Sequence, residues 1–295
     1  MKKESRNNFI QKINFRKHIK ESCAGFSGKQ LKIADYIIRD NDEATFLTAA
    51  QLASKVQVSK FTVVRFAATL GYEGYPEFQG HLRKIIMEQL TSTERLKLSI
   101  HSETKDNLFR WTLLKEADNI IGAYRNISTD DFWKMIDIIL RSKKVFVAGL
   151  RASTCLTQFI VFQLRKIREN VIGITHGGKD SWDIIRRGVP EDLLIAIAFP
   201  RYTREMVELI DFTHHMKIQV AGITDSVTSP IAVRCRPTLF VPFELLTYVN
   251  LYSATFAVIA ALIAEIAIRD KKKTHLRLNE FEDFVKQGDL YYKVS

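Results

Sequence analysis

The chain of 295 residues has few cysteines and no apolar run long enough to span a membrane. Its 3 cysteines, Cys23, Cys155 and Cys235, lie far apart without a CxxC motif, which excludes a disulfide framework and a zinc module and indicates a reducing compartment. The longest apolar run, 254–268, contains Glu265 and is shorter than the roughly 20 residues a span requires. There is no apolar leader at the N-terminus. We therefore expect a soluble, cytoplasmic protein without metal, cofactor or membrane partner.

Glycine and proline are also sparse, and the charge is unbalanced. The 13 glycines and 6 prolines exclude a collagen-like chain, and a hydrophobic share of 46% excludes disorder and supplies a sizeable core. The 44 basic residues exceed the 33 acidic ones, which gives a net charge of +11. The basic excess is densest in residues 1–25. This balance favours an anionic partner, although charge alone does not distinguish nucleic acid from an anionic membrane.

Apolar spacing divides the chain into two parts. Up to about residue 105 the spacing is helical throughout. From residue 145 onward, short apolar runs alternate with helix-length segments, which is typical of a parallel sheet with helices on both faces. The runs are Val145–Ala148, Val171–Thr175, Leu193–Phe199, Ile218–Thr224 and Leu239–Val241. We expect an all-α domain followed by an α/β three-layer domain with a parallel sheet.

The segment after residue 47 has the spacing of two short helices joined by a tight turn. Thr48 and Gln51 stand at capping-box spacing, so the first helix should begin directly after Thr48. Ser59 should cap the second helix, and Gly71 should follow its last turn. Apolar residues at helical spacing give these helices an inward face: Leu52, Ala53, Val56, Val63, Phe66 and Leu70. This pattern predicts a helix-turn-helix.

A helix-turn-helix enters the DNA major groove with the N-terminus of its second helix, while its first helix meets the phosphate backbone. The candidate DNA contacts therefore lie on the outward arc of the second helix and at the start of the first. They are Thr48, Gln51, Ser59, Lys60, Phe61, Thr62, Val64 and Arg65. Gln57 departs from the pattern because it occupies the turn position where glycine is common. A helical hairpin in an ordinary bundle is the alternative interpretation.

Motifs around this segment resemble one known family. FSGKQLKIADYI from Phe26, SxxTVVRF from Ser59 and LGYxGYxxF from Leu70 are similar to the DNA-binding domain of the RpiR/MurR transcriptional regulators. The resemblance implies a dimeric bacterial regulator with a C-terminal SIS (sugar isomerase-like) domain that binds a carbohydrate derivative. A homodimer or higher homo-oligomer would read an inverted repeat in double-stranded DNA.

The resemblance and the change of spacing together suggest domain boundaries. We expect a basic N-terminal arm at 1–25, a helix-turn-helix domain at 26–90, a polar linker at 91–105, a SIS domain at 106–270 and a C-terminal tail at 271–295.

Two loops of the α/β half bear on the ligand. Similar SIS domains carry Gly-x-Gly-x-Ser after the first strand and Ser-x-Ser-Gly-x-Thr after the third, where they bind phosphate. In this chain Arg151 replaces the second glycine of the first loop, and Arg201 occupies the second loop. Because guanidinium groups match phosphate or carboxylate, we expect an anionic effector. Its candidate contacts are Gly149, Arg151, Ser153, Thr154, Arg201 and Thr203. Alternatively, the arginines block the pocket, or Arg201 pairs with an acidic neighbour.

The expected function is that of a bacterial DNA-binding transcriptional regulator of a metabolic operon, controlled by a small anionic metabolite, either a sugar phosphate or a carboxylate. The alternative is a SIS-type phosphosugar isomerase carrying an extra helical domain. Isomerisation requires a Glu or His base near the sugar, and no carboxylate occupies either glycine-loop position. We therefore expect no catalytic residue. Gly177–Gly178 fits a simple loop, and Glu205 fits a helix-surface charge.

Overall fold

A computed structural model describes residues 19, 22, 25–39, 44–89, 91–101, 107–243 and 248–292. The chain divides into two compact units. Unit 1 comprises Met1–Leu108 and Glu244–Asn250, and unit 2 comprises Phe109–Phe243 and Leu251–Ser295. No helix among the described residues is both long enough and apolar enough to cross a membrane.

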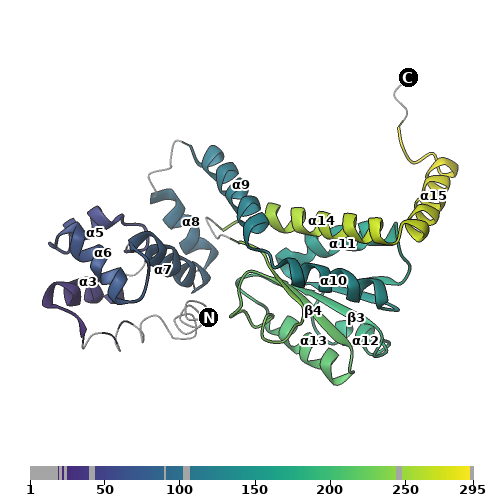
Figure 1. The fold of residues 1–295 in the computed structure, drawn as a ribbon, viewed down its shortest axis with the longest axis horizontal. Helices are drawn as coiled ribbons and strands as arrows, with labels where there is room; N and C mark the ends of the chain where they lie inside the picture. The colour runs from purple at the N-terminus through teal and green to yellow at the C-terminus, as the bar shows by residue number, and fades with distance from the viewer. Residues whose placement is uncertain are drawn as a thin grey trace. The chain divides into compact units, whose positions relative to one another are not determined.

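Unit 1 is helical (Figure 1). Its helices are α3 (Gly28–Arg39), α5 (Ala49–Lys55), α6 (Lys60–Thr69), α7 (Tyr75–Gln89) and α8 (Ser92–His101). The core is aromatic at its centre, where the Phe66 ring lies 5.1 Å from that of Phe26 and 5.6 Å from that of Phe78. Ile19 is 0% exposed and belongs to the same core, so this core includes a residue of the segment expected to be an arm.

The polar segment expected as a linker contains α8. Thr91 and Glu94 explain why it is helical, because they form a capping box at its start. The Glu94 carboxylate accepts from the Thr91 amide at 2.7 Å, and the Thr91 hydroxyl accepts from the Glu94 amide at 3.3 Å. These hydrogen bonds from Thr91 hold the pKa of the Glu94 carboxyl below its usual value.

Unit 2 contains a five-stranded parallel sheet in the order β2-β1-β3-β4-β5. The strands are β1 (Val145–Gly149), β2 (Val171–Ile174), β3 (Leu193–Ile197), β4 (Gln219–Thr224) and β5 (Thr238–Phe240). Each coincides with one of the predicted apolar runs to within two residues. β1 and β3 are buried along their whole length, which is why they read as unbroken apolar runs. The predicted α/β three-layer architecture is confirmed.

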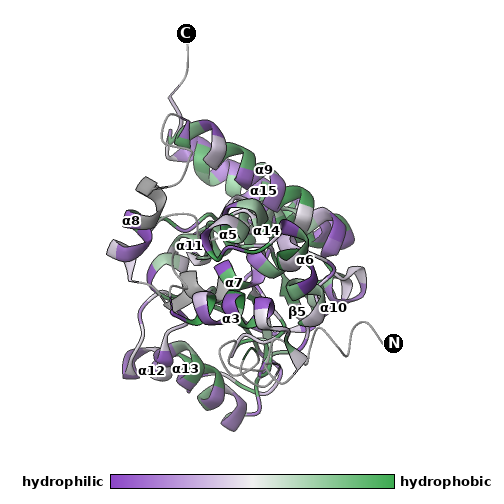
Figure 2. Cartoon of the chain, turned by 90° about the vertical axis from the view of Figure 1, so that its left-hand side faces the viewer, coloured by the Kyte–Doolittle hydropathy of each residue, from purple (hydrophilic) through white to green (hydrophobic). Residues whose placement is uncertain are grey.

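Helices cover both faces of the sheet (Figure 1). Those of unit 2 are α9 (Leu108–Asn126), α10 (Thr129–Arg141), the 3-10 turn η2 (Arg151–Ser153), α11 (Thr154–Arg165), α12 (Lys179–Ile185), α13 (Arg204–His215), α14 (Ser253–Arg269) and α15 (Lys271–Gln287). One layer contains α10, α11 and α14, and the other contains α12 and α13. Along α13, hydrophobic and hydrophilic residues alternate (Figure 2), and its buried side carries Met206, Leu209 and Ile210.

The segment expected as a C-terminal tail forms α15, which packs on unit 2. Arg277 of α15 pairs with Glu169, and Lys166 lies 5.1 Å from the Phe281 ring centroid. The apolar run 254–268 lies within α14, which is buried on one side only. Its outward side carries exposed small residues, namely Ala257, Ala260, Ala261 and Ala264.

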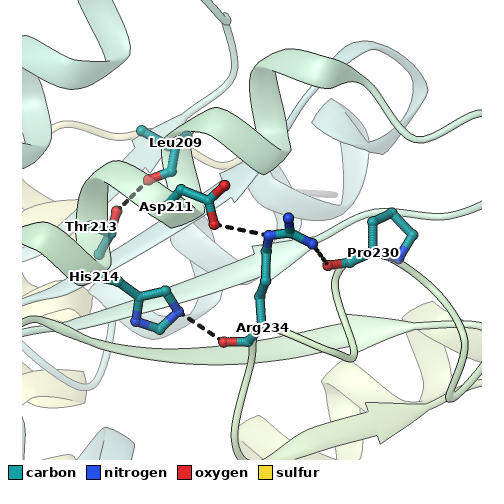
Figure 3. A network of polar contacts seen from close by, with 6 residues as sticks. All are labelled: Leu209, Asp211, Thr213, His214, Pro230 and Arg234. Atoms are coloured by element: carbon teal, nitrogen blue, oxygen red, sulfur yellow. Dashed lines mark hydrogen bonds and ion pairs between the residues drawn. The ribbon is translucent and has the colours of Figure 1, made fainter.

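Arg234 holds the turn after β4 against α13 (Figure 3). Its guanidinium donates to Asp211 Oδ1 at 2.8 Å and to the Pro230 carbonyl at 3.1 Å. Its own carbonyl lies 2.8 Å from Nε2 of His214. The Ser229 hydroxyl accepts from the Ala232 amide at 3.0 Å within the same turn. These contacts hold the loop at the end of β4 in place.

Candidate functional site

The first helix of the predicted helix-turn-helix begins where the capping box placed it. The Thr48 hydroxyl accepts from the Gln51 amide at 3.3 Å, and the Gln51 side-chain oxygen accepts from the Thr48 amide at 2.8 Å. Both halves of the box are present, and α5 starts at Ala49. This geometry leaves the N-terminal end of α5 exposed, as a phosphate contact requires.

The second helix also has its predicted ends. The Ser59 hydroxyl accepts from the Thr62 amide at 3.2 Å and lies 2.9 Å from the Thr62 hydroxyl, so the two side chains together cap α6. Gly71 follows the helix with φ 92°, in the left-handed region that favours glycine. On the inward face, Val63 and Phe66 are fully buried.

The predicted DNA contacts lie mostly on exposed surface. Seven of the eight are exposed and Thr62 is half-buried. Phe61 is 68% exposed and Val64 38% exposed, so the outward arc of α6 is partly apolar. The Arg65 guanidinium carbon lies 5.8 Å from the Phe61 ring centroid. The arc therefore presents donors and an aromatic ring side by side, a combination that can contact both phosphates and base edges.

The LGYxGYxxF motif supports this pair of helices from inside. The Tyr75 hydroxyl donates to the Leu47 carbonyl at 2.7 Å, and Gln79 donates to the same carbonyl at 2.9 Å. Burial raises the pKa of the Tyr75 phenol, so the group remains a donor. Because Leu47 directly precedes Thr48, these bonds position the start of α5. Tyr75 of the motif and the neighbouring Gln79 thus have a structural role.

The candidate effector loops lie at the point where the strand order reverses. β1 lies between β2 and β3, so the next two strands along the chain, β2 and β3, pair with opposite sides of β1. Gly149 at the end of β1 is in register with Ile197 at the end of β3. The loops that carry Arg151 and Arg201 therefore follow neighbouring strand ends. In open α/β sheets this switch point is where ligands bind.

Both loop arginines adopt a left-handed backbone conformation that is much more common for glycine. Arg151 has φ 54° and Arg201 has φ 72°, and both residues are exposed. A left-handed conformation costs an L-residue about 1–2 kcal/mol. Such outliers gather at binding sites, where the surrounding fold holds them in place. In both loops a cation therefore stands where the backbone conformation favours glycine.

Gly149 and Thr154 build the first loop. A side chain at position 149 would collide with the Thr157 hydroxyl, 2.4 Å from an added Cβ. The Thr154 hydroxyl donates to the Gly149 carbonyl at 3.3 Å and to the Thr175 carbonyl at 3.4 Å. These contacts pack the start of α11 against the ends of β1 and β2. Both residues therefore have a place in the fold in addition to the ligand contact predicted for them.

Ser153 is 5% exposed and faces an aromatic cluster that the sequence did not reveal. Its hydroxyl lies 3.4 Å from that of Tyr252, and it makes no side-chain cap on α11. The Tyr252 ring lies 5.5 Å from that of Phe199 and 5.6 Å from that of Phe243. The Ser153–Tyr252 contact joins positions 99 residues apart, so no local pattern indicates it.

The second loop brings acidic groups to the same edge. Thr203 caps α13 as predicted, since its hydroxyl accepts from the Met206 amide at 3.3 Å. The Tyr202 hydroxyl donates to Asp225, which follows β4. A side chain at Gly177, after β2, would run into the Glu205 carboxylate, 2.4 Å from an added Cβ. The edge thus combines two arginines with two carboxylates.

A groove of about 550 Å³ lies at the other end of the sheet, between α11, the start of β2 and α15. Its arginines already have partners. Arg277 pairs with Glu169 and Glu280, Arg165 donates to the Val171 carbonyl, and Arg168 donates to two backbone carbonyls after α10 and within it. Burial lowers the pKa of Arg168. The arginines of this groove are therefore engaged in contacts within the fold. In the described part of the chain, no three His, Cys, Asp or Glu residues are placed to hold a metal ion.

Each half of the chain matches a known protein-family model. Residues 13–89 match the helix-turn-helix domain of the rpiR family, and residues 138–265 match the SIS domain. The uncharacterized HTH-type transcriptional regulator YfhH of Escherichia coli is 26% identical over 230 residues, which are 75% of this chain and 79% of YfhH.

Two solved structures share the fold. NanR of Vibrio vulnificus, complexed with ManNAc-6P, has a TM-score of 0.58 at 18% identity and covers 95% of this chain and 100% of its own. The sugar isomerase domain of the RpiR transcription factor from Sphaerobacter thermophilus has a TM-score of 0.58 at 21% identity and covers 60% of this chain and 99% of its own.

Proposed function

Because the chain belongs to the RpiR family of helix-turn-helix regulators that carry a SIS domain, we propose that it is a homodimeric transcriptional regulator in the cytoplasm. One observation carries the proposal: a properly capped α6 presents a continuous exposed arc of donors and apolar groups. In the proposed complex, Ser59, Lys60 and Arg65 reach base edges and phosphates in the major groove. Thr48 and Gln51 meet the backbone at the start of α5.

The proposed signal is a small anionic metabolite at the switch point of the sheet. Arg151 and Arg201 would grip its phosphate or carboxylate, with Ser153 and Thr203 at the starts of two helices. The complex of NanR with ManNAc-6P, on the same two-domain fold, supports a sugar phosphate. A carboxylate fits the same guanidinium donors. The proposal assigns no catalysis to the SIS domain, in keeping with YfhH, which is named a transcriptional regulator.

Fluorescence anisotropy with the full chain tests the proposal. The probe is a labelled duplex recovered by selection from random double-stranded DNA. We expect an inverted repeat with half-sites about one helical turn, or a multiple, apart. The doubly substituted Lys60→Ala, Arg65→Ala chain should lose this binding, whereas Arg39→Ala on α3 should retain it. Selection of no sequence, or equal binding by all three chains, would overturn the DNA-binding proposal.

A second arm tests the effector. A hexose 6-phosphate, citrate and inorganic phosphate are each titrated into the protein–DNA complex. We expect at least one of the first two to shift DNA affinity by more than tenfold at millimolar concentration. If neither of them changes binding or protein melting temperature, the effector half of the proposal fails while the DNA half remains.

A further inference from the structure

Helix α7 holds the segment that leads into α5. The Gln79 side-chain amide donates to the Thr45 carbonyl at 3.2 Å and to the Leu47 carbonyl at 2.9 Å. Phe46 lies between these two residues in the sequence, so one amide fixes the backbone on both sides of it. Tyr75, one helical turn before Gln79, donates to the same Leu47 carbonyl at 2.7 Å. Phe46 therefore has a fixed place beside α7.

Arg83 continues this row of contacts along α7. It lies one turn after Gln79 on the same face of the helix, because residues four positions apart are neighbours on a helix surface. Its guanidinium carbon lies 5.0 Å from the Phe46 ring centroid, in a cation–π contact. Both side chains are half-buried. The ring thus restricts a long charged side chain that would otherwise sample many rotamers.

This cation lies next to the proposed DNA surface. Phe46 precedes Thr48 by two residues, and consecutive Cα atoms are about 3.8 Å apart, so the Cα atoms of Phe46 and Thr48 are separated by at most about 7.6 Å. Thr48 caps α5, which is the first helix of the helix-turn-helix. The first helix crosses the phosphate backbone when the second enters the major groove. The Arg83 guanidinium therefore lies beside the part of the motif that meets phosphates.

A guanidinium held over a ring suits a phosphate. The ring contact engages the face of the planar group, whereas its five N–H donors point outward in the plane, with a spacing that matches two phosphate oxygens. An arginine that is already restrained also loses less conformational freedom when it binds. Phe46 and Gln79 thus make Arg83 a more effective anion-binding group than a mobile surface cation.

We propose that Arg83 binds a DNA phosphate beside the start of α5 and that the Phe46 ring holds its guanidinium in position. The inference rests on the proposed DNA binding. It extends the DNA-binding surface from the two helices of the motif to α7, which lies outside that motif. Because a phosphate contact carries no sequence information, Arg83 adds affinity for every duplex.

Anisotropy titrations of the full chain at several salt concentrations test the contact, with the selected duplex and with a duplex of scrambled sequence. Arg83→Gln removes the charge and keeps most of the stem on Phe46. It should weaken binding to both duplexes about tenfold. The slope of log binding constant against log salt concentration should become shallower by about 0.9. Arg83→Met, a second neutral variant of similar length, should behave in the same way.

Two further variants serve as controls for charge and for position. Arg83→Lys retains the charge and should keep the salt dependence of the unmodified chain. Arg39→Ala removes a cation of α3 in the same unit and should change neither affinity nor salt dependence. Thermal melting followed by circular dichroism shows that each variant is folded at the temperature of the titration.

Phe46→Leu separates the phosphate contact from a purely structural role of Arg83. It removes the ring and keeps the cation, so affinity should fall several-fold while the salt dependence stays unchanged. An unchanged salt dependence in folded Arg83→Gln and Arg83→Met would overturn the phosphate contact. A loss of binding confined to the selected duplex would also overturn it, because that loss would indicate a base contact. If the unmodified chain bound neither duplex, the DNA-binding proposal itself would fail as well.

Discussion

Arg151 and Arg201 both adopt left-handed backbone, with φ 54° and φ 72°, in loops that follow the adjacent strands β1 and β3. Glycine reaches this conformation without strain, and arginine does not. A guanidinium at each of these exposed positions thus costs backbone free energy. The cost is understandable if the cations bind an anion there.

Replacing each arginine with glycine separates these effects. Arg151→Gly and Arg201→Gly should raise the free energy of unfolding by up to about 1 kcal/mol, because glycine relieves the strain. Each should also weaken anion binding about tenfold or more, since a charged hydrogen bond contributes about 1.5–3 kcal/mol. Calorimetry with glucose 6-phosphate and citrate measures the second effect.

Lys217 supplies the matched control. It is an exposed cation with φ 58° that precedes β4, at the opposite edge of the sheet. Lys217→Gly should show the same gain in stability and no change in anion affinity. Tighter anion binding by Arg151→Gly or Arg201→Gly would mean that the arginines block the pocket.

The basic side chains of α6 should contact DNA in one of two ways, at a base or at a phosphate. Lys60→Ala or Arg65→Ala should weaken operator binding by about 1–3 kcal/mol if the side chain contacts a base, with reduced specificity at that position. If it contacts a phosphate, affinity should fall for every DNA sequence. The slope of log binding constant against log salt concentration (the salt slope) should also become shallower by about 0.9. Anisotropy titrations at several salt concentrations distinguish the two. Arg39→Ala serves as the control, and failure of that variant to bind would point to a fold defect.

Phe61 should read thymine. Its 68% exposed ring on the outward arc of α6 is an unusual surface group, and apolar side chains in the major groove contact the thymine methyl. An operator with uracil in place of thymine lacks only that methyl group. The unmodified chain should bind it several-fold more weakly, whereas Phe61→Ala should bind both operators equally. Equal discrimination by the two chains would exclude Phe61 as the reader.

Local features of this chain were predictable from its sequence, and long-range ones were not. Thr48 and Ser59 cap helices by hydrogen bonds to residues three positions away, so these caps can be recognised from residue spacing. Buried parallel strands are apolar on both faces, so they can be recognised as unbroken apolar runs. The Ser153–Tyr252 contact exists only because the fold brings α14 to the loop after β1. Likewise α15 reads as a solvated tail because its first residues are lysines, and its packing depends on Glu169 and Lys166, which lie far away in the sequence.

Gln57 in the helix-turn-helix turn stores strain of the same kind as the loop arginines. Its φ is 55°, at the position where the sequence pattern favours glycine. Gln57→Gly should raise the free energy of unfolding by about 0.5–1 kcal/mol. Gln57→Ala is the matched control, because alanine keeps the strain and should give no gain. Chemical denaturation of the full chain measures both, and an equal gain from alanine would attribute the effect to removal of the glutamine side chain.

The basic N-terminal arm should bind DNA phosphates, and its deletion must respect the core of unit 1. Residues 1–18 of the predicted arm, 1–25, lie outside the described residues, but Ile19 is 0% exposed among the core side chains of unit 1. Deleting residues 1–18 should leave the melting temperature unchanged and reduce the salt slope of DNA binding by about 0.9 for each phosphate that the arm neutralises. Deleting residues 1–22 removes Ile19 as well, and truncating a buried isoleucine costs about 2–5 kcal/mol. The longer deletion should therefore also lower the melting temperature by several degrees. An unchanged salt slope in the shorter deletion would show that the arm does not touch DNA.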